Sequence, residues 1–229
     1  CPYAFGPPLG HRGADDTHLW RWFHVKHPFE TRRALADIRA LGLPADAVDL
    51  EALGMWSEAL AERASSTNLL GPEELARLWP RHLLESLAYA LLLDRRLPVY
   101  DAGSGAGFPG VPLAMAGYEV TLVEPRRKRF LWLRYSVEVL GVPARVVRGR
   151  LEDVCEAAPE DCQFVCRALA APAETLQMLA GYGRRGSLTL RRGPAFGDSC
   201  RLVRPLPSPP LDRDGLLVQF RLPEDLRGG

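Results

Sequence analysis

Hydrophobic residues recur at helical spacing from residue 31 to about residue 95. The segment 31–43 has this periodicity, with Thr31 as its capping residue and Gly42 at its end. A second helix is expected to follow Pro44, and a third to begin after Gly71 and to kink at Pro80. One buried face of the second helix is predicted at Leu50, Leu53, Trp56 and Leu60.

After Pro98 the pattern changes to short apolar runs that alternate with helical segments, which is typical of a parallel sheet. The last two apolar runs, CRLVRPL and LLVQFRL, flank a Pro-rich break and predict a final antiparallel hairpin. The fold class is therefore α/β, with helices on both faces of a mostly parallel, twisted sheet. Strands are expected at 99–103, 120–124, 145–149, 164–168 and 187–191, and helices at 109–117, 126–140 and 172–182.

These patterns divide the chain into three parts. Residues 1–30 are rich in Gly, Pro and His without periodicity, and we expect a poorly ordered extension there. Residues 31–95 are expected to form a helical N-terminal cap, and residues 96–229 the main α/β domain.

Composition indicates a soluble globular protein, since apolar residues make up 47% and charged residues 25% of the 229 positions. No apolar run is long enough to span a membrane, and the N-terminal region lacks the apolar core of a secretion signal. The five cysteines form neither a CxxC pair nor a regular framework, so a cytoplasmic protein with reduced thiols is expected. The net charge of +1 predicts that any nucleic acid would be bound by a local basic patch.

The stretch DAGSGAGFPG, at the end of the first predicted strand, carries the strongest chemical signal. Glycine lets a backbone turn sharply and approach a ligand, and Gly103, Gly105 and Gly107 occupy alternate positions. A dinucleotide fingerprint needs its third glycine where this chain has Phe108. The spacing instead resembles the first motif of class I S-adenosylmethionine methyltransferases, and Glu124, at the end of the second strand, can accept hydrogen bonds from ribose hydroxyls.

Longer segments narrow the resemblance to one family. They are NLLGPEELARLWPRHLLESL, DAGSGAGFPGVPLA, VTLVEPRRKRFLWLR, GRLEDV and CRALA, within about residues 65–193. Together they resemble the bacterial small-subunit ribosomal RNA 7-methylguanosine methyltransferases, also called glucose-inhibited division protein B. The resemblance implies methyl transfer from S-adenosylmethionine to N7 of a specific guanine in the decoding-site loop of 16S ribosomal RNA, within the small ribosomal subunit, by a monomer that does not bind membranes.

The same resemblance implies roles for individual residues. Glu124 would take the cofactor ribose, Leu151 and Glu152 would flank its adenine, and the glycine loop with Phe108 would contact the rest. Arg167 would reach cofactor or substrate, and His82 and Asn68 would line the approach from the cap. The expected catalytic residues are Arg167 and His82, and the expected cofactor-binding residues are Gly103, Gly105, Gly107, Phe108, Glu124, Leu151, Glu152 and Arg167.

The chain departs from the family pattern at three places. Glu85 stands where the family usually has aspartate, Cys166 where it has serine or threonine, and Arg191-Arg192-Gly193 replaces a lysine-glycine pair. Arginine can replace a lysine that only neutralises phosphate, but not one that serves as a compact hydrogen-bonding point. The third departure leaves open a non-enzymatic relative that keeps the fold.

Chemistry and charge complete the prediction. Guanine N7 has a free lone pair, so methyl transfer needs neither a general base nor a metal, although Cys166 leaves a covalent route open. A basic rim would bind RNA phosphates, whereas a small-molecule methyltransferase would need no rim and a solvated basic face would have no ligand. The expected RNA-binding residues are Arg126, Arg127, Lys128, Arg129, Arg191 and Arg192.

Overall fold

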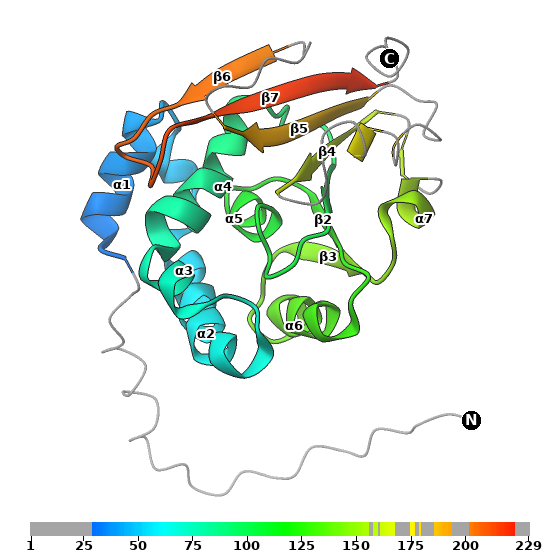
Figure 1. Cartoon of the computed structure of the whole chain (residues 1–229), viewed down its shortest axis with the longest axis horizontal. Coiled ribbons are helices and arrows are strands. Elements are labelled where there is room, and N and C mark those ends of the chain that lie inside the picture. Colours follow the sequence, from blue (N-terminus) through cyan, green and yellow to red (C-terminus); the bar gives the residue numbers. More distant parts are fainter. Residues whose placement is uncertain are drawn as a thin grey trace, which may run out of the picture.

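A seven-stranded sheet forms the centre of the molecule, in the order β3-β2-β1-β4-β5-β7-β6 (Figure 1). The structure is a computed structural model that describes residues 29–155, 158–159, 161–167, 175–176, 179, 186–193 and 202–222. Strands β1 to β5 pair in parallel, and β7 runs antiparallel between β5 and β6. The strands are β1 (Val99–Ala102), β2 (Val120–Val123), β3 (Ala144–Val147), β4 (Cys162–Cys166), β5 (Gly186–Arg192), β6 (Leu202–Leu206) and β7 (Gly215–Leu222).

This sheet confirms the predicted α/β class, the five parallel strands and the final hairpin. The strand ends differ from the expected ones by at most two residues. The hairpin returns so that β7, and not β6, pairs with β5. Because β7 is antiparallel, the loop that joins β6 to β7 lies at the edge where β5 ends, beside Arg191 and Arg192.

Residues 31–91 contain a series of helices, and the first of them lie on the opposite side of Figure 1 from helix α7. Thr31 does not cap the first helix, contrary to expectation: it is the first helical residue, and Glu30 precedes it as the N-cap. Asp49 caps the second helix, where its side chain accepts a hydrogen bond from the Ala52 N–H at 2.9 Å. The elements are α1 (Thr31–Ala40), the short turn η2 (Ala45–Ala47), α2 (Leu50–Thr67), α3 (Pro72–Ala76), η3 (Leu78–Leu83), α4 (Leu84–Ala88) and η4 (Tyr89–Leu91).

The third predicted helix is split by a π-helical stretch, η3, in which Pro80 lies. Proline has no N–H and its ring collides with the carbonyl four residues earlier, so a regular α-helix cannot continue through it. The wider π turn accommodates the ring, and such turns are frequent at functional sites. The kink expected at Pro80 is thus a change of helix type that ends before α4.

Three further helices follow the first strands: α5 (Gly110–Met115), α6 (Arg127–Glu138) and α7 (Leu151–Cys155). The pattern of hydrophobic residues predicts the first two but not α7, which has only five residues. Of the helix expected at 172–182, the described residues are Thr175, Leu176 and Leu179, which are helical.

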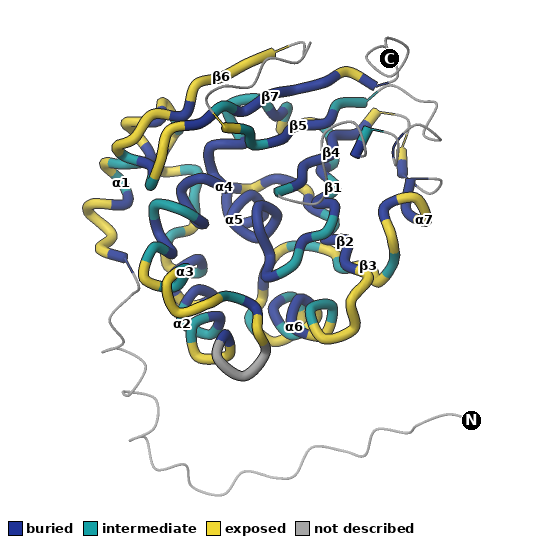
Figure 2. The backbone as a smooth tube through the Cα atoms, viewed as in Figure 1, coloured by how far each residue is buried: buried dark blue, intermediate teal, exposed yellow. Residues whose placement is uncertain are grey.

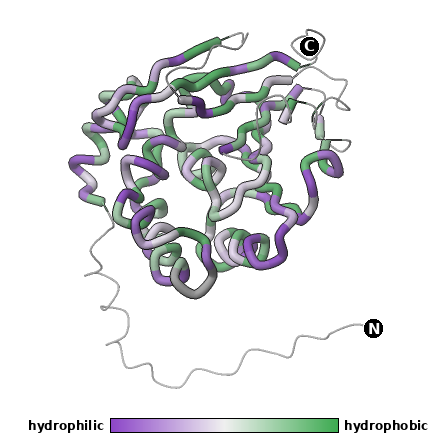
Figure 3. The backbone as a smooth tube through the Cα atoms, in the orientation of Figure 1, coloured by the Kyte–Doolittle hydropathy of each residue, from purple (hydrophilic) through white to green (hydrophobic). Residues whose placement is uncertain are grey.

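Buried residues are concentrated in the central strands such as β1, β2 and β4, whereas the edge strands β3 and β6 are mostly half-buried or exposed (Figure 2). On one face of the sheet a single core joins the cap to the sheet through side chains such as Ile38, Trp56, Leu84 and Leu122. On the other face a smaller core forms around Phe164 and Leu188. In the hydropathy view of the same fold (Figure 3), hydrophobic segments follow the strands of the interior. The expected boundary between residues 31–95 and 96–229 therefore does not coincide with a gap in the core.

None of the described helices combines the length and the apolar character that crossing a membrane requires.

Candidate functional site

The loop between β1 and α5 has a backbone that only glycine adopts easily. Gly103, Gly105 and Gly107 all have positive φ, at 70°, 59° and 116°, where a Cβ is disfavoured. The Gly103 and Ser104 N–H groups donate to the Val123 carbonyl at 2.9 and 3.0 Å. The loop is therefore fixed to the end of β2 by backbone hydrogen bonds.

Packing imposes a second requirement at Gly107. A Cβ there would lie 2.8 Å from Val111 Cγ2 and 2.9 Å from Trp56 Cζ2. At Gly105 the nearest atoms to an added Cβ are 3.7 and 3.9 Å away, so backbone conformation alone favours glycine. The two positions hold glycine for different reasons: Gly107 faces the cap core, and Gly105 lines open space.

Glu124 fixes the loop from the end of β2. Its Oε2 accepts a hydrogen bond from the Gly105 N–H at 3.0 Å, and its Oε1 accepts one from the Arg126 N–H at 2.8 Å. Glu124 as a whole is 2% exposed. Each carboxylate oxygen has further lone pairs, so this geometry is compatible with additional donors such as ribose hydroxyls.

A pocket of about 390 Å³ opens at the carboxyl edge of β1, β2 and β4, which is where open α/β sheets bind ligands. Of the residues that the sequence predicted for the cofactor, it contains Gly103, Gly105, Phe108, Glu124 and Arg167. The cap contributes Leu69 and Leu70, which the sequence did not single out. The remaining lining residues are Ser104, Ala106, Pro125, Arg126 and Arg129.

Several predicted site residues lie outside this lining. Gly107 packs against the core, and the adjacent α7 residues Leu151 and Glu152 do not line the pocket. Asn68 has a left-handed backbone (φ 52°), ends α2 and is exposed. His82 is buried behind Phe108, with ring centroids 5.1 Å apart.

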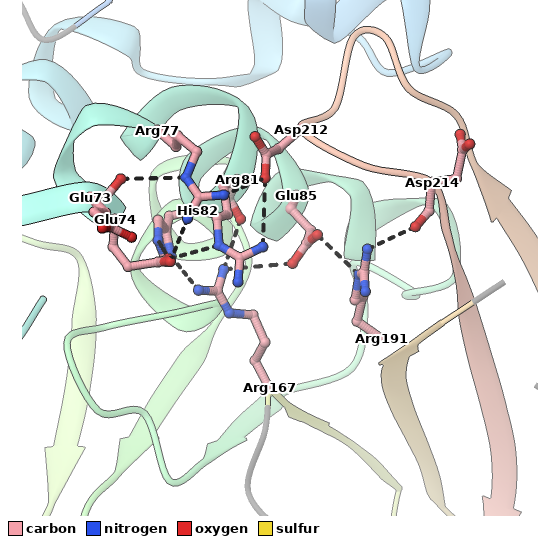
Figure 4. A network of polar contacts seen from close by, with 10 residues as sticks. All are labelled: Glu73, Glu74, Arg77, Arg81, His82, Glu85, Arg167, Arg191, Asp212 and Asp214. Carbon is pink, nitrogen blue, oxygen red and sulfur yellow. Dashed lines mark hydrogen bonds and ion pairs between the residues drawn. The ribbon is translucent and has the colours of Figure 1, made fainter. Parts of the chain in front are cut away.

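Arg167 and His82 meet in a network of charged side chains between the cap and the ends of β4 and β5 (Figure 4). Arg167 Nη2 donates to His82 Nδ1, and Arg167 Nη1 donates to the Arg81 carbonyl at 3.1 Å. His82 Nε2 lies 2.7 Å from Glu74 Oε2. The guanidinium also lies over the Phe108 ring at 5.2 Å from its centroid, a cation–π contact.

The protonation state of His82 follows from these partners. Burial, and then the neighbouring Arg167, lower the pKa of His82 to about 4. A guanidinium can only donate, so Nδ1 must accept and Nε2 must carry the proton. His82 is therefore a neutral imidazole at neutral pH with both ring nitrogens engaged, and it has no free lone pair to act as a base.

The second half of the network centres on Glu85, which is buried on α4. Its Oε2 forms an ion pair of poor hydrogen-bond geometry with Arg191 Nε at 3.0 Å, and its Oε1 lies 3.8 Å from Arg167 Nη1. Arg191 Nη2 also donates to the Asp214 carbonyl at 3.0 Å. Arg191, expected to bind RNA, thus has its guanidinium between protein groups, and its side chain is 10% exposed.

The loop between β6 and β7 joins the same network through Asp212. Its Oδ2 lies 3.4 Å from Arg77 Nη1 and 3.6 Å from Arg81 Nη1. The sequence pattern singles out neither Asp212 nor Glu74. Asp212 stands in a Pro-rich break, and nothing in the local pattern indicates that this loop reaches the cap.

Basic residues gather at the start of α6. Arg126, Arg127 and Lys128 are exposed, and Arg129 is half-buried. The first turn of α6 has no acidic residue, although the positive end of the helix dipole disfavours cations there. Helix stability therefore gives no reason for this cluster, and a bound anion would supply one.

The three cysteines that the structure describes, Cys155, Cys162 and Cys166, are buried and are poor candidates for chemistry. Cys166 is buried in β4, and its carbonyl accepts a hydrogen bond from the Tyr89 hydroxyl at 2.9 Å. Burial raises the pKa of Cys155 to about 12. Within the described part of the chain, no group of three or more His, Cys, Asp or Glu side chains is placed to hold a metal ion.

Comparison with known proteins identifies a family. The profile of the GidB family, described as rRNA small subunit methyltransferase G, matches residues 49–193. The Ribosomal RNA small subunit methyltransferase G of Mycolicibacterium smegmatis is 46% identical over 106 residues, which cover 45% of each chain. Its counterpart in Mycolicibacterium paratuberculosis is 38% identical over 164 residues, 65% of this chain and 66% of the relative. The counterpart in Corynebacterium diphtheriae is 34% identical over 164 residues, 70% and 69% of the two chains.

The chain thus spans less than two thirds of the first two relatives. Among solved structures, a crystal structure of a point mutant of MtNAS has a TM-score of 0.50 at 20% identity. The match covers 85% of this chain and 82% of the MtNAS chain. This likeness concerns the fold alone.

Proposed function

The chain belongs to the GidB family, rRNA small subunit methyltransferase G, and on that premise we propose that it methylates N7 of a guanine in 16S ribosomal RNA. S-adenosylmethionine is the proposed methyl donor, and the small ribosomal subunit in the cytoplasm is the proposed partner of a monomeric enzyme. The observation that carries the proposal is the pocket that brings the glycine loop, Glu124 and Arg167 together.

The residues present fit this cofactor. A loop with positive φ at three glycines exposes backbone instead of side chains, which allows a ligand to approach closely. Glu124 offers carboxylate lone pairs beside the loop for the ribose. Arg167 offers donors for an oxyanion, and a planar guanidinium matches a carboxylate well. Leu151 and Glu152, expected at the adenine, form the start of α7.

The chemistry demands positioning more than proton transfer. When bound, S-adenosylmethionine supplies a methyl group on a positively charged sulfur. The glycine loop and Glu124 would hold this cofactor in the pocket. Leu69 and Leu70 of the cap would exclude water from the pocket. Guanine N7 attacks with its own lone pair, so the neutral, fully engaged His82 suits a reaction without a base.

The basic cluster supports an RNA substrate. Arg126 and Arg129 line the pocket, and Arg127 and Lys128 extend the positive charge outward along α6. RNA phosphates would neutralise these side chains and release counterions. Arg192 belongs to the same proposal.

The test is transfer of a radiolabelled methyl group to isolated small subunits and to naked 16S RNA, with the modified base identified as 7-methylguanine. Glu124→Ala, measured by calorimetry, is expected to weaken S-adenosylmethionine binding by about 1–3 kcal/mol, because hydroxyls lose a charged partner. Methylation of a small diffusible compound but not of RNA would contradict the proposed substrate. Unchanged cofactor affinity in Glu124→Ala would remove Glu124 from the cofactor site.

A further inference from the structure

The carboxylate of Glu74, on α3 of the cap, lies at hydrogen-bond distance from three side chains, those of Arg77, Arg81 and His82. Its Oε1 accepts from Arg77 Nη2 at 2.9 Å, and its Oε2 accepts from Arg81 Nε and lies next to His82 Nε2, both at 2.7 Å (Figure 4). Burial would raise the pKa of Glu74, but the hydrogen bonds from Arg81 and His82 outweigh it and the net pKa lies below its ordinary value. Glu74 is therefore an ionised acceptor at neutral pH.

Arg167 and Glu74 together determine which nitrogen of His82 carries the proton. Arg167 Nη2 donates to Nδ1, so Nδ1 must be free of hydrogen. A neutral imidazole then carries its single hydrogen on Nε2, where Glu74 accepts it. The opposite tautomer would set an N–H of His82 against the N–H of Arg167 and leave a lone pair facing the carboxylate. Glu74 thus fixes the tautomer that Arg167 needs.

The guanidinium of Arg167 links this arrangement to the pocket. Two of its five N–H groups have partners on the cap, namely His82 Nδ1 and the Arg81 carbonyl. The guanidinium is a rigid planar fork, so two fixed donors determine the directions of the others. Arg167 also lines the pocket, where its remaining donors can meet an oxyanion.

We infer that Glu74 is a positioning residue for methyl transfer: it fixes the Nε2–H tautomer of His82, which holds Arg167 toward an oxyanion in the pocket. The inference rests on the proposed function for the identity of the reaction. The oxyanion is either the carboxylate of the cofactor or a phosphate of the RNA, and separate measurements distinguish the two.

The test compares Glu74→Ala with Glu73→Ala in the full chain. Glu73 precedes Glu74 on the same helix and is exposed, and only its carbonyl joins the network, with Arg77 Nε at 3.4 Å. Imidazole nitrogen NMR reads the tautomer, and His82→Asn identifies the His82 signals among the five histidines. Glu74→Ala is expected to replace the single Nε2–H signature with a mixture and to slow single-turnover methylation at least tenfold. Glu73→Ala should change neither.

Two titrations locate the oxyanion. A weaker affinity for S-adenosylmethionine in calorimetry assigns it to the cofactor, and a raised KM for RNA with unchanged cofactor affinity assigns it to a phosphate. If Glu74→Ala keeps the Nε2–H signature, or loses it without any change in rate, cofactor affinity or KM, the inference is wrong.

A double-mutant cycle separates positioning through His82 from a structural role of Glu74. In His82→Asn the amide oxygen can accept from Arg167, and an asparagine has no tautomers. Glu74→Ala should therefore have a much smaller effect on rate in the His82→Asn background than in the natural chain. Equal effects in both backgrounds would overturn the inference. The NMR and calorimetric readouts involve no RNA, so a wild-type chain inactive on ribosomal RNA would contradict the proposed function and leave the tautomer result standing.

Discussion

Two buried carboxylates, Asp101 and Glu85, have contrasting partners. Asp101, on β1, is fully buried; its Oδ2 accepts the Gly110 N–H at 2.9 Å, and its Oδ1 has no hydrogen-bond partner among the described residues. Glu85, on α4, is paired with two arginines from β5 and the end of β4. One carboxylate is held by the backbone of its own loop, and the other by charges from distant segments.

The comparison shows how each half of the site tolerates buried charge. Burial raises the pKa of Asp101 to about 7, against an ordinary value of 3.8. Near neutral pH its carboxyl therefore keeps much of its proton and avoids the cost of an unpaired charge. Around Glu85 the charges are compensated by pairing instead. The stability of the glycine-loop half should therefore depend on pH and on added side-chain atoms. The stability of the charged half should depend on whether each charged group keeps its partner.

Glu85→Ala is expected to have the largest effect. Removing this carboxylate leaves Arg167 and Arg191 without their buried acidic partner, and breaking a buried ion pair costs about 3–5 kcal/mol. Urea unfolding measures the loss, with Glu85→Gln as a control that preserves volume and should be less destabilised. A loss of less than about 1 kcal/mol for Glu85→Ala would show that water already solvates this pair.

Asp101→Asn should act on the pH dependence of stability. The raised pKa means that the folded chain binds the proton more tightly than the unfolded chain. The resulting stabilisation is present below about pH 4 and is lost as the pH rises through about 7, a change of at most about 4 kcal/mol. Asp101→Asn should flatten that decline. The readout is the slope of the free energy of unfolding against pH, between pH 5 and 8, compared with the natural chain. The slope is used because the asparagine amide nitrogen would have no partner at the position of Oδ1, which lowers the stability at every pH. An identical slope in both chains would contradict the assignment.

Gly107→Ala and Gly105→Ala separate the effect of packing from that of backbone conformation within the loop. Both positions have positive φ, which costs alanine about 1–2 kcal/mol. At Gly107 the new Cβ also collides with Trp56 and Val111, and overpacking adds about 1–3 kcal/mol. Thermal unfolding should therefore place Gly107→Ala below Gly105→Ala. Equal losses would mean that Trp56 moves aside without cost.

Reversing charge at Arg127 and Lys128 should have the smallest effect, confined to RNA. These exposed side chains do not line the pocket, so cofactor affinity should stay unchanged in Arg127→Glu/Lys128→Glu. The KM for RNA should rise about tenfold, and its dependence on salt should become less steep because fewer counterions are released. If the double variant keeps the KM for RNA and its salt dependence, the RNA does not bind at the start of α6.

The sequence was sufficient for features whose cause is local. Short apolar runs predicted the strands to within two residues, and the three glycines after Asp101 predicted a loop that turns sharply, at which all three have positive φ. It also predicted that Gly103, Phe108, Glu124 and Arg167 share one site, because strand ends of a parallel sheet meet at one edge. Helix α7 was not predicted, because five residues are too few to show a helical hydrophobic period.

Local pattern alone determined the fold class and the glycine loop, since backbone conformation depends on neighbouring residues. The contacts in the charged half of the site depend on the complete fold. Glu74, His82, Glu85, Arg167, Arg191 and Asp212 come from six separate elements and loops, and their spacing in the sequence carries no sign of contact. The difference is physical: a turn is fixed by the φ angles of a few successive residues, whereas a buried charge depends on whichever partner the completed fold brings within hydrogen-bond distance.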